Sequence, residues 1–172
     1  MALADDLLGQ AHQLATREPK RPKQASLRRA VSTAYYALFH LLLDAVAREV
    51  VCGQGQEPLR GLVSRSCQHG AMKDFCQTIT KSGGQRLPMP ANALLDRPLS
   101  SALVDVANAF VELQQARHEA DYDLSRRIAR DDVQELLEVA DQAFHSLRSI
   151  DKKASQRRLF LLGLIFHQRW NR

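Results

Sequence analysis

Apolar residues recur every three or four positions through residues 22–52, and this is the strongest structural signal in the chain. The repeating residues are Leu27, Val31, Ala34, Leu38, Leu41 and Ala45. This spacing places all six side chains on one face of a long α-helix. The glycines and the proline of the following CGQGQEP stretch stop the helix.

Four further stretches have helical periodicity, and none shows the alternating pattern of a strand. They cover residues 3–17, residues 57–82, residues 99–125 and a stretch that begins near residue 131. We expect the second stretch to be one interrupted helix or two short ones, with the break at Gly70. Asp131 is expected to cap the last helix, with Gln134 completing a capping box. The pattern leaves open whether this helix continues past Lys152.

These elements predict an all-α protein. The predicted architecture is an antiparallel, up-and-down bundle of four to five helices with an extra C-terminal helix. We expect residues 1–150 to form the bundle and residues 151–172 to form an extension packed on the bundle or on a dimer partner. No membrane span is expected, because the longest apolar run, LFLLGLIF, is much shorter than the roughly 20 residues that a spanning helix needs.

The C-terminal extension concentrates large apolar residues near a chain end. As a helix, it would share one broad face among Leu159, Leu162, Ile165, Phe166 and Trp170. Arg158, Gly163 and Arg169 would lie elsewhere. Chain ends are usually polar, so this face needs a cover. The bundle itself, a dimer partner or a membrane surface could provide it. We expect the segment to be helical and covered by protein.

The charge and cysteine content narrow the function classes. The formal net charge of +5 mildly favours polyanions such as RNA as partners. Three cysteines without a CxxC pair argue against a disulfide framework. Cys67, His69 and Cys76 supply too few ligands, at non-standard spacing, for a zinc site, so we expect no metal and no cofactor. Acidic residues near the start disfavour a signal peptide, and the expected location is the cytoplasm.

The stretch AVSTAYYALFH places polar residues beside the apolar face of the longest predicted helix. These residues are Ser32, Tyr35, Tyr36 and His40. Such a row indicates either a hydrated groove between helices or a set of satisfied hydrogen bonds in the core. Tyrosine often packs its ring and pairs its hydroxyl, and a neutral histidine is often satisfied in the same way.

Arg117 interrupts the apolar face of the helix predicted at residues 99–125. A charged residue in this position needs a partner, and Asp121, one helical turn further on, can supply it. His118 and Tyr122 form a second pair with the same spacing. Two interpretations are open: an internal ion pair that fixes helix register, or an anion site, because a guanidinium group suits phosphate.

The stretches SLRRAVSTAYYALFH and ARHEADYD together resemble the HEPN domain, the higher eukaryotes and prokaryotes nucleotide-binding family. The similarity is to its small prokaryotic single-domain branch and covers residues 1–150. The resemblance implies a four- or five-helix bundle and a homodimer around a composite site. Family members include metal-independent ribonucleases, partners of small nucleotidyltransferases in toxin–antitoxin pairs, and RNA-binding accessories.

The chain departs from the ribonuclease signature of that family, an arginine followed after four to six residues by a histidine. No histidine of this sequence stands at that distance from an arginine; Arg65 and His69 are closest, with three residues between them. Tyr122, Asp123 and Leu124 occupy the histidine positions after Arg117. Tyrosine and aspartate are poor replacements for a base that titrates near pH 7. We therefore expect little or no ribonuclease activity.

The leading hypothesis is an HEPN-like protein that binds RNA or a nucleotide and pairs with a nucleotidyltransferase. Arg117 would contact phosphate and Asp121 would orient it. The remaining groove residues would be Ser32, Tyr35, Tyr36, His40 and Tyr122. Basic runs at residues 17–29 and 152–158 would extend the site if they converged with Arg117.

Two alternatives stay open. The first is an atypical ribonuclease that uses His40 or His118. The second is a structural dimerisation module without a ligand.

Overall fold

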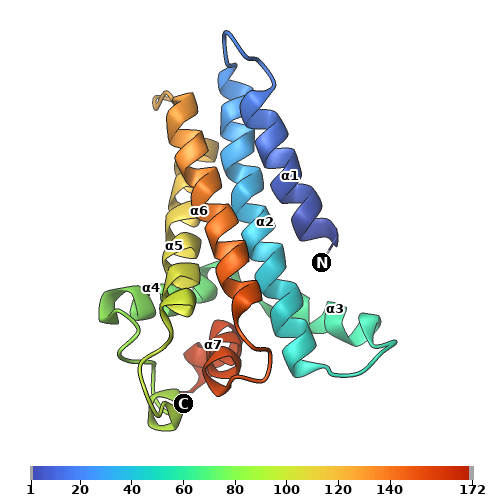
Figure 1. The fold of residues 1–172 in the computed structure, drawn as a ribbon, viewed down its shortest axis with the longest axis vertical. Coiled ribbons are helices and arrows are strands. Elements are labelled where there is room, and N and C mark those ends of the chain that lie inside the picture. The colour runs from blue at the N-terminus through green and yellow to red at the C-terminus, as the bar shows by residue number, and fades with distance from the viewer. Residues whose placement is uncertain (1, 171–172) are drawn as a thin grey trace. The chain divides into compact units, whose positions relative to one another are not determined.

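The protein is an all-α helical bundle, as the sequence predicts. The computed structural model describes residues 2–170, which form seven α-helices and no strand (Figure 1). The helices are α1 (Ala2–Thr16), α2 (Gln24–Val50), α3 (Glu57–Ser66), α4 (His69–Ser82), α5 (Ser101–Tyr122), α6 (Arg130–Ser149) and α7 (Ser155–Phe166). Two 3-10 helices, η1 (Ala91–Leu94) and η2 (His167–Arg169), complete the set.

The described residues group into two compact units. Unit 1 combines residues 2–41 with residues 109–145, and unit 2 combines residues 42–108 with residues 146–170. Helices α2, α5 and α6 each contribute a segment to both units. These units do not coincide with the predicted boundary at residue 150, because the C-terminal residues group with the middle of the chain.

Four helical segments pack in antiparallel fashion within unit 1. Between α1 and α6, His12 Nε2 lies 3.1 Å from Asp141 Oδ1, and Arg130 Nη1 donates to the Pro19 carbonyl at 2.7 Å. Residue numbers thus rise along one chain segment as they fall along the other. The same holds between α2 and α5, which are joined through Arg28 to Ala120 and through Tyr36 to Arg117.

The core of unit 1 uses the predicted apolar face of α2. All six residues of that face are buried along the full helix. In unit 1 they are joined by Tyr35, Phe110, Leu113, Val133 and Leu137. Helix α2 is also long and apolar enough to cross a membrane, but 83% of its most apolar window is buried by protein, as in a core helix.

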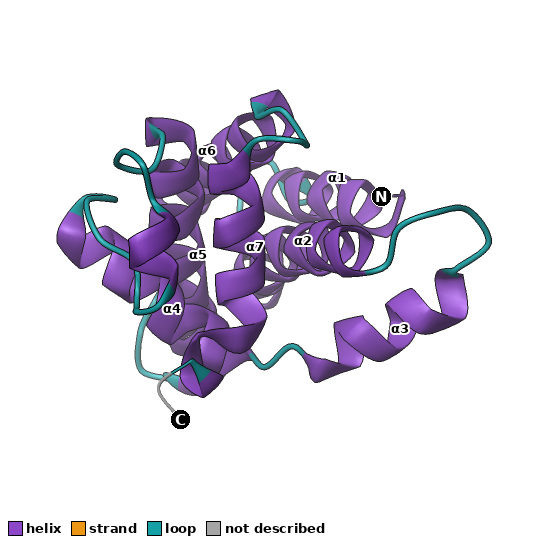
Figure 2. Ribbon diagram, turned by 90° about the horizontal axis from the view of Figure 1, so that it is seen from below, coloured by secondary structure: helices purple, strands orange, loops and turns teal. Residues whose placement is uncertain are grey.

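Helices α4 and α7 pack against each other in unit 2 (Figure 2). The predicted C-terminal helix is therefore confirmed, and the protein itself covers it. The predicted buried face is wrong, however. Phe160, Leu161, Gly163 and Leu164 are buried, whereas Leu159 and the other residues of the predicted face are only partly covered. Gly163 lies on the buried side of α7, and the ring of Phe75 occupies the space that a side chain at this position would fill.

Two predicted helix boundaries are corrected by the structure, and a third that the sequence left open is now defined. The break between α3 and α4 falls at Cys67, whose backbone is extended, and Gly70 lies inside α4. Helix α6 begins one residue before Asp131, and Asp132 rather than Gln134 reaches back to accept a hydrogen bond from the Ala129 backbone N–H at 3.2 Å. Helix α6 ends at Ser149, so it does not continue into the C-terminal helix.

Candidate functional site

The predicted partnership of Arg117 and Asp121 is confirmed in unit 1. Arg117 Nε lies 2.7 Å from Asp121 Oδ2, one turn along α5, and the two side chains are 24% and 25% exposed. Arg117 Nη2 donates to the Tyr36 hydroxyl at 3.3 Å. The ion pair therefore links one turn of α5 to α2 and leaves part of the guanidinium group accessible.

Both carboxylate oxygens of Asp121 are engaged. Asp121 Oδ1 accepts a hydrogen bond from Ser32 Oγ at 2.5 Å, and Ser32 is only 1% exposed. Burial lowers the pKa of Arg117, but the interactions with Tyr36, Asp121 and Tyr122 outweigh it and leave the pKa raised. The guanidinium group is therefore a permanent charge held in one place, and Asp121 orients it as the sequence predicts.

Aromatic rings surround this charge. Arg117 Cζ lies 5.7 Å from the centre of the Tyr36 ring and 5.6 Å from that of Tyr122, within the range of cation–π attraction. The predicted pair of His118 and Tyr122 is also formed, with ring centres 5.0 Å apart. Unlike Tyr36, Tyr122 is largely exposed, at 64%. The structure thus gathers Ser32, Tyr36, Arg117, His118, Asp121 and Tyr122.

Two predicted groove residues are not among these gathered side chains, although the centre of the Tyr35 ring lies 5.3 Å from that of Tyr36. Tyr35 is 0% exposed and packs its ring on Phe39 and Phe110, with ring centres 6.1 and 5.7 Å away. It therefore belongs to the core and cannot line an accessible groove. His40 lies one turn beyond Tyr36 and is half-buried, with the edge of its ring against Phe39 at 5.7 Å.

The half-buried position of His40 predicts a pH dependence of stability. Burial lowers the pKa of His40 below its ordinary value of 6.5 because it disfavours the charged imidazolium. Above pH 6.5 His40 is neutral in both the folded and the unfolded chain, so its burial costs no stability there. As the pH falls below 6.5, the unfolded chain binds a proton at His40 more readily than the folded protein does, and the free energy of unfolding should decrease. We expect urea unfolding to show a smaller loss of stability below pH 6.5 in His40→Gln than in the parent. His40 titration by NMR at or above 6.5 would contradict this.

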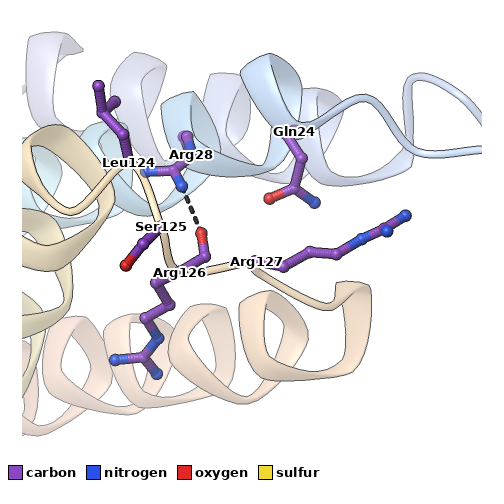
Figure 3. Close-up of a pocket in the computed structure, with 6 residues that line it drawn as sticks. All are labelled: Gln24, Arg28, Leu124, Ser125, Arg126 and Arg127. Atoms are coloured by element: carbon purple, nitrogen blue, oxygen red, sulfur yellow. Dashed lines mark hydrogen bonds between the residues drawn. The ribbon is translucent and has the colours of Figure 1, made fainter.

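The segment between α5 and α6 is fixed by a side chain that sequence analysis did not single out for this role. Arg28 Nη1 donates to the carbonyl oxygens of Ala120 at 2.7 Å and of Asp123 at 3.0 Å. Arg28 Nη2 donates to the carbonyl oxygen of Arg126 (Figure 3). The last carbonyls of a helix lack partners within the helix, so this cation satisfies the carbonyl of Ala120 in the last turn of α5 and complements the helix dipole.

Two further contacts hold the same segment. The Gln24 side-chain amide donates to the Ile128 carbonyl at 2.8 Å and accepts from the Ile128 N–H at 2.9 Å. Asp123 Oδ1 accepts from the Ser125 hydroxyl at 2.6 Å and from the backbone N–H groups of Ser125 and Arg126. The hydrogen bond from Ser125 is the main cause of the lowered pKa of Asp123. Residues 123–128 therefore form a fixed surface rather than a loose connection.

A cavity of about 200 Å³ lies between this segment and α2. Its lining residues are Gln24, Arg28, Leu124, Ser125, Arg126 and Arg127 (Figure 3). The Arg126 side chain points away from Arg28 and pairs with Glu119, whereas the Arg127 side chain extends in a different direction from that of Arg126 (Figure 3).

Exposed cations gather around the same end of unit 1. Arg130 donates to the carbonyls of Glu18 and Pro19, and Gln24 bonds to Ile128, so residues 17–23 lie beside residues 123–130. Arg126 is also exposed but pairs with Glu119. We call the other exposed cations of these two segments the basic rim: Arg17, Lys20, Arg21, Lys23 and Arg127. Part of the first predicted basic run thus adjoins the segment that follows Arg117.

The second predicted basic run has a different environment, in unit 2. Arg157 is buried and lies 3.6 Å from Glu49, and Arg158 lies 3.0 Å from the same carboxylate. Burial is the main cause of the lowered pKa of Arg157, and Glu49 opposes it. Arg157 is therefore a structural cation, and Arg158 shares its partner. Lys152 and Lys153 of this run are exposed and lie outside the pairing with Glu49.

The cysteine and histidine residues considered for zinc do not assemble into a site. Within residues 2–170, no three histidine, cysteine or acidic side chains are placed to hold a metal ion. Cys76 is fully buried, and burial raises the pKa of Cys67 to about 11. Both thiols therefore stay protonated near neutral pH, whereas a metal ligand must be a thiolate.

The fold defines the class of this protein as an all-α helical bundle whose unit 1 carries a fixed cationic end. No protein-family model, curated protein or solved structure matches the chain.

Proposed function

We propose that this protein is an HEPN-like helical bundle that binds RNA or a nucleotide. It acts as a homodimer and as one half of a toxin–antitoxin-type pair with a small nucleotidyltransferase. The observation that carries the binding proposal is the basic rim, because its five cations come from two segments distant in sequence that lie side by side. The resemblance in ARHEADYD and SLRRAVSTAYYALFH supports the family and the partner.

The charge balance at the basic rim favours a phosphate chain as ligand. Arg17 is 3.9 Å from Glu18, and its side chain is 69% exposed, so this contact leaves most of the guanidinium group in water. Lysine and arginine side chains on a surface bind phosphates with release of counterions, which makes such binding strongly dependent on salt. The proposed ligand is therefore held mainly by its backbone charge.

Arg117 supports this surface from the end of α5. The carboxylate of Asp121 partly neutralises the charge of Arg117, which weakens its attraction for a ligand. Its main role is therefore to hold the Tyr122 ring in place. The part of the guanidinium group that remains accessible can still attract a phosphate. Asp121 and Ser32 keep Arg117 in this orientation.

We expect fluorescence anisotropy to show binding of a labelled single-stranded RNA that weakens steeply with salt. If four phosphate contacts release counterions, affinity should fall about 50-fold between roughly 50 and 200 mM salt. The variant with Lys20→Gln, Arg21→Gln, Lys23→Gln and Arg127→Gln should lose most of this binding and most of its salt dependence. These side chains are exposed, so its melting temperature should change little.

A charge-matched control separates the rim from net charge. The control variant removes an equal number of positive charges from exposed positions of unit 2: Lys81→Gln, Arg86→Gln, Lys152→Gln and Lys153→Gln. This variant should bind RNA nearly as well as the parent. Equal losses in both variants would refute a localised site. A parent protein that dimerises in light scattering but binds no RNA would favour the structural module instead.

A further inference from the structure

Tyr122 is an exposed aromatic ring held in a fixed position. It is 64% exposed, yet Arg117 lies over the ring and His118 packs beside it. Arg117 is itself fixed by Asp121, whose other oxygen is bonded to the buried Ser32. A chain of contacts from the core thus ends in a surface ring, although the fold gains little burial from that ring.

The residues that follow Tyr122 supply cations and a cavity. Tyr122 is the last residue of α5, and the next residues carry Leu124, which is 86% exposed, and Arg127. The contacts of Arg28 and Gln24 hold this backbone in place. From Tyr122 to Arg127 the chain can span at most about 17 Å, which is the scale of a few nucleotides.

We propose that this end of unit 1 binds a single-stranded nucleic acid. An unpaired base stacks on the ring of Tyr122, and the adjoining phosphates lie along the cavity and near Arg127. This inference rests on the proposed function and adds which form of nucleic acid binds and by which contact. Every base has a flat face, so stacking on an aromatic ring tolerates many sequences while basic side chains track the backbone.

The same geometry disfavours a duplex. In double-stranded RNA the base faces are covered by their neighbours, and proteins contact mainly phosphates and 2′-hydroxyl groups. A duplex could therefore use the basic rim but not the exposed face of Tyr122. Arg117 adds to the contrast, because a cation over the ring polarises the platform on which the base stacks.

The test compares Tyr122→Ala and Tyr122→Phe with the parent by fluorescence anisotropy. The probes are a labelled single-stranded RNA, a single-stranded DNA of the same sequence and an RNA duplex, with inorganic polyphosphate as a competitor that has charge but no bases. Tyr122→Ala should weaken binding of the single-stranded RNA roughly tenfold. Tyr122→Phe should bind like the parent, because it keeps the ring. Neither variant should change the affinity for duplex RNA or polyphosphate.

Each outcome decides a separate question. Single-strand binding that is unchanged in Tyr122→Ala but lost in the quadruple rim variant would overturn stacking and keep the proposed function. A parent protein that binds none of the probes would overturn both. Leu124→Ala tests apolar contact at the same surface, since Leu124 lines the cavity and the change removes an exposed apolar side chain without a flat π-face. An equal loss in Leu124→Ala would replace stacking by simple apolar contact. Weaker binding of the DNA than of the RNA would assign the ligand to RNA.

Discussion

Replacing Gly163 by valine should lower the free energy of unfolding by about 3 kcal/mol or more. A Cβ atom at this position would lie 2.0 Å from Cζ of Phe75 and 2.4 Å from Cε2. The Phe75 ring cannot move aside easily, because it is fully buried and packs on Phe160 with ring centres 6.0 Å apart. Urea denaturation followed by circular dichroism measures the effect.

A glycine without this neighbour gives the control. Gly9 lies inside α1, and nothing would approach its Cβ within 4 Å. Gly9→Ala should raise stability by about 0.5–1 kcal/mol, because alanine favours a helix over glycine. A smaller side chain at the other side of the contact should relieve the clash, so Phe75→Leu combined with Gly163→Ala should be less destabilised than the sum of the two single changes. Full stability of Gly163→Val would refute the packing described for α4 and α7.

Replacing Arg28 by methionine should lower the free energy of unfolding by about 2–3 kcal/mol. Arg28 donates to three backbone carbonyls, and a hydrogen bond from a charged donor contributes more than a neutral one. Methionine keeps most of the apolar stem but leaves these carbonyls to water or without a partner. Amide hydrogen exchange should also speed up at residues 123–128, where the backbone would lose its anchor.

Arg29 is the matched control for this change. It is the next residue of α2 and has the same charge, but its side chain is exposed. Arg29→Met should change stability by no more than about 0.5 kcal/mol. Arg28→Lys should recover only part of the loss, because one ammonium group cannot reach three carbonyls as the guanidinium fork does. Equal effects at both positions would show that charge at the start of α2 matters rather than the contacts of Arg28.

Local patterns in the sequence predicted much of the fold and part of the site. The apolar face of α2 and the pairs Arg117 with Asp121 and His118 with Tyr122 follow from helical spacing alone, and the structure confirms them. Tyr35 and Tyr36 could not be told apart in this way. They differ in burial: Tyr35 is 0% exposed and packs on Phe110, which is distant in sequence, whereas Tyr36 is partly exposed.

The missed features involve partners that a sequence pattern does not display. Arg28 binds backbone carbonyls, which every residue has, so no residue type marks the contact. The inward face of α7 was misplaced because hydrophobic periodicity counts large side chains, whereas the buried position of Gly163 depends on the absence of one. Both features require knowledge of which helices become neighbours.

The contacts of Gln24, Arg28 and Asp123 have a consequence for binding kinetics. A loop that orders only when its ligand arrives loses conformational entropy at that moment, and this loss weakens affinity. Here the backbone of residues 123–128 already has its hydrogen-bond partners in the free protein. A ligand at this surface therefore meets a preorganised site, and changes in its contacts should alter the dissociation rate more than the association rate.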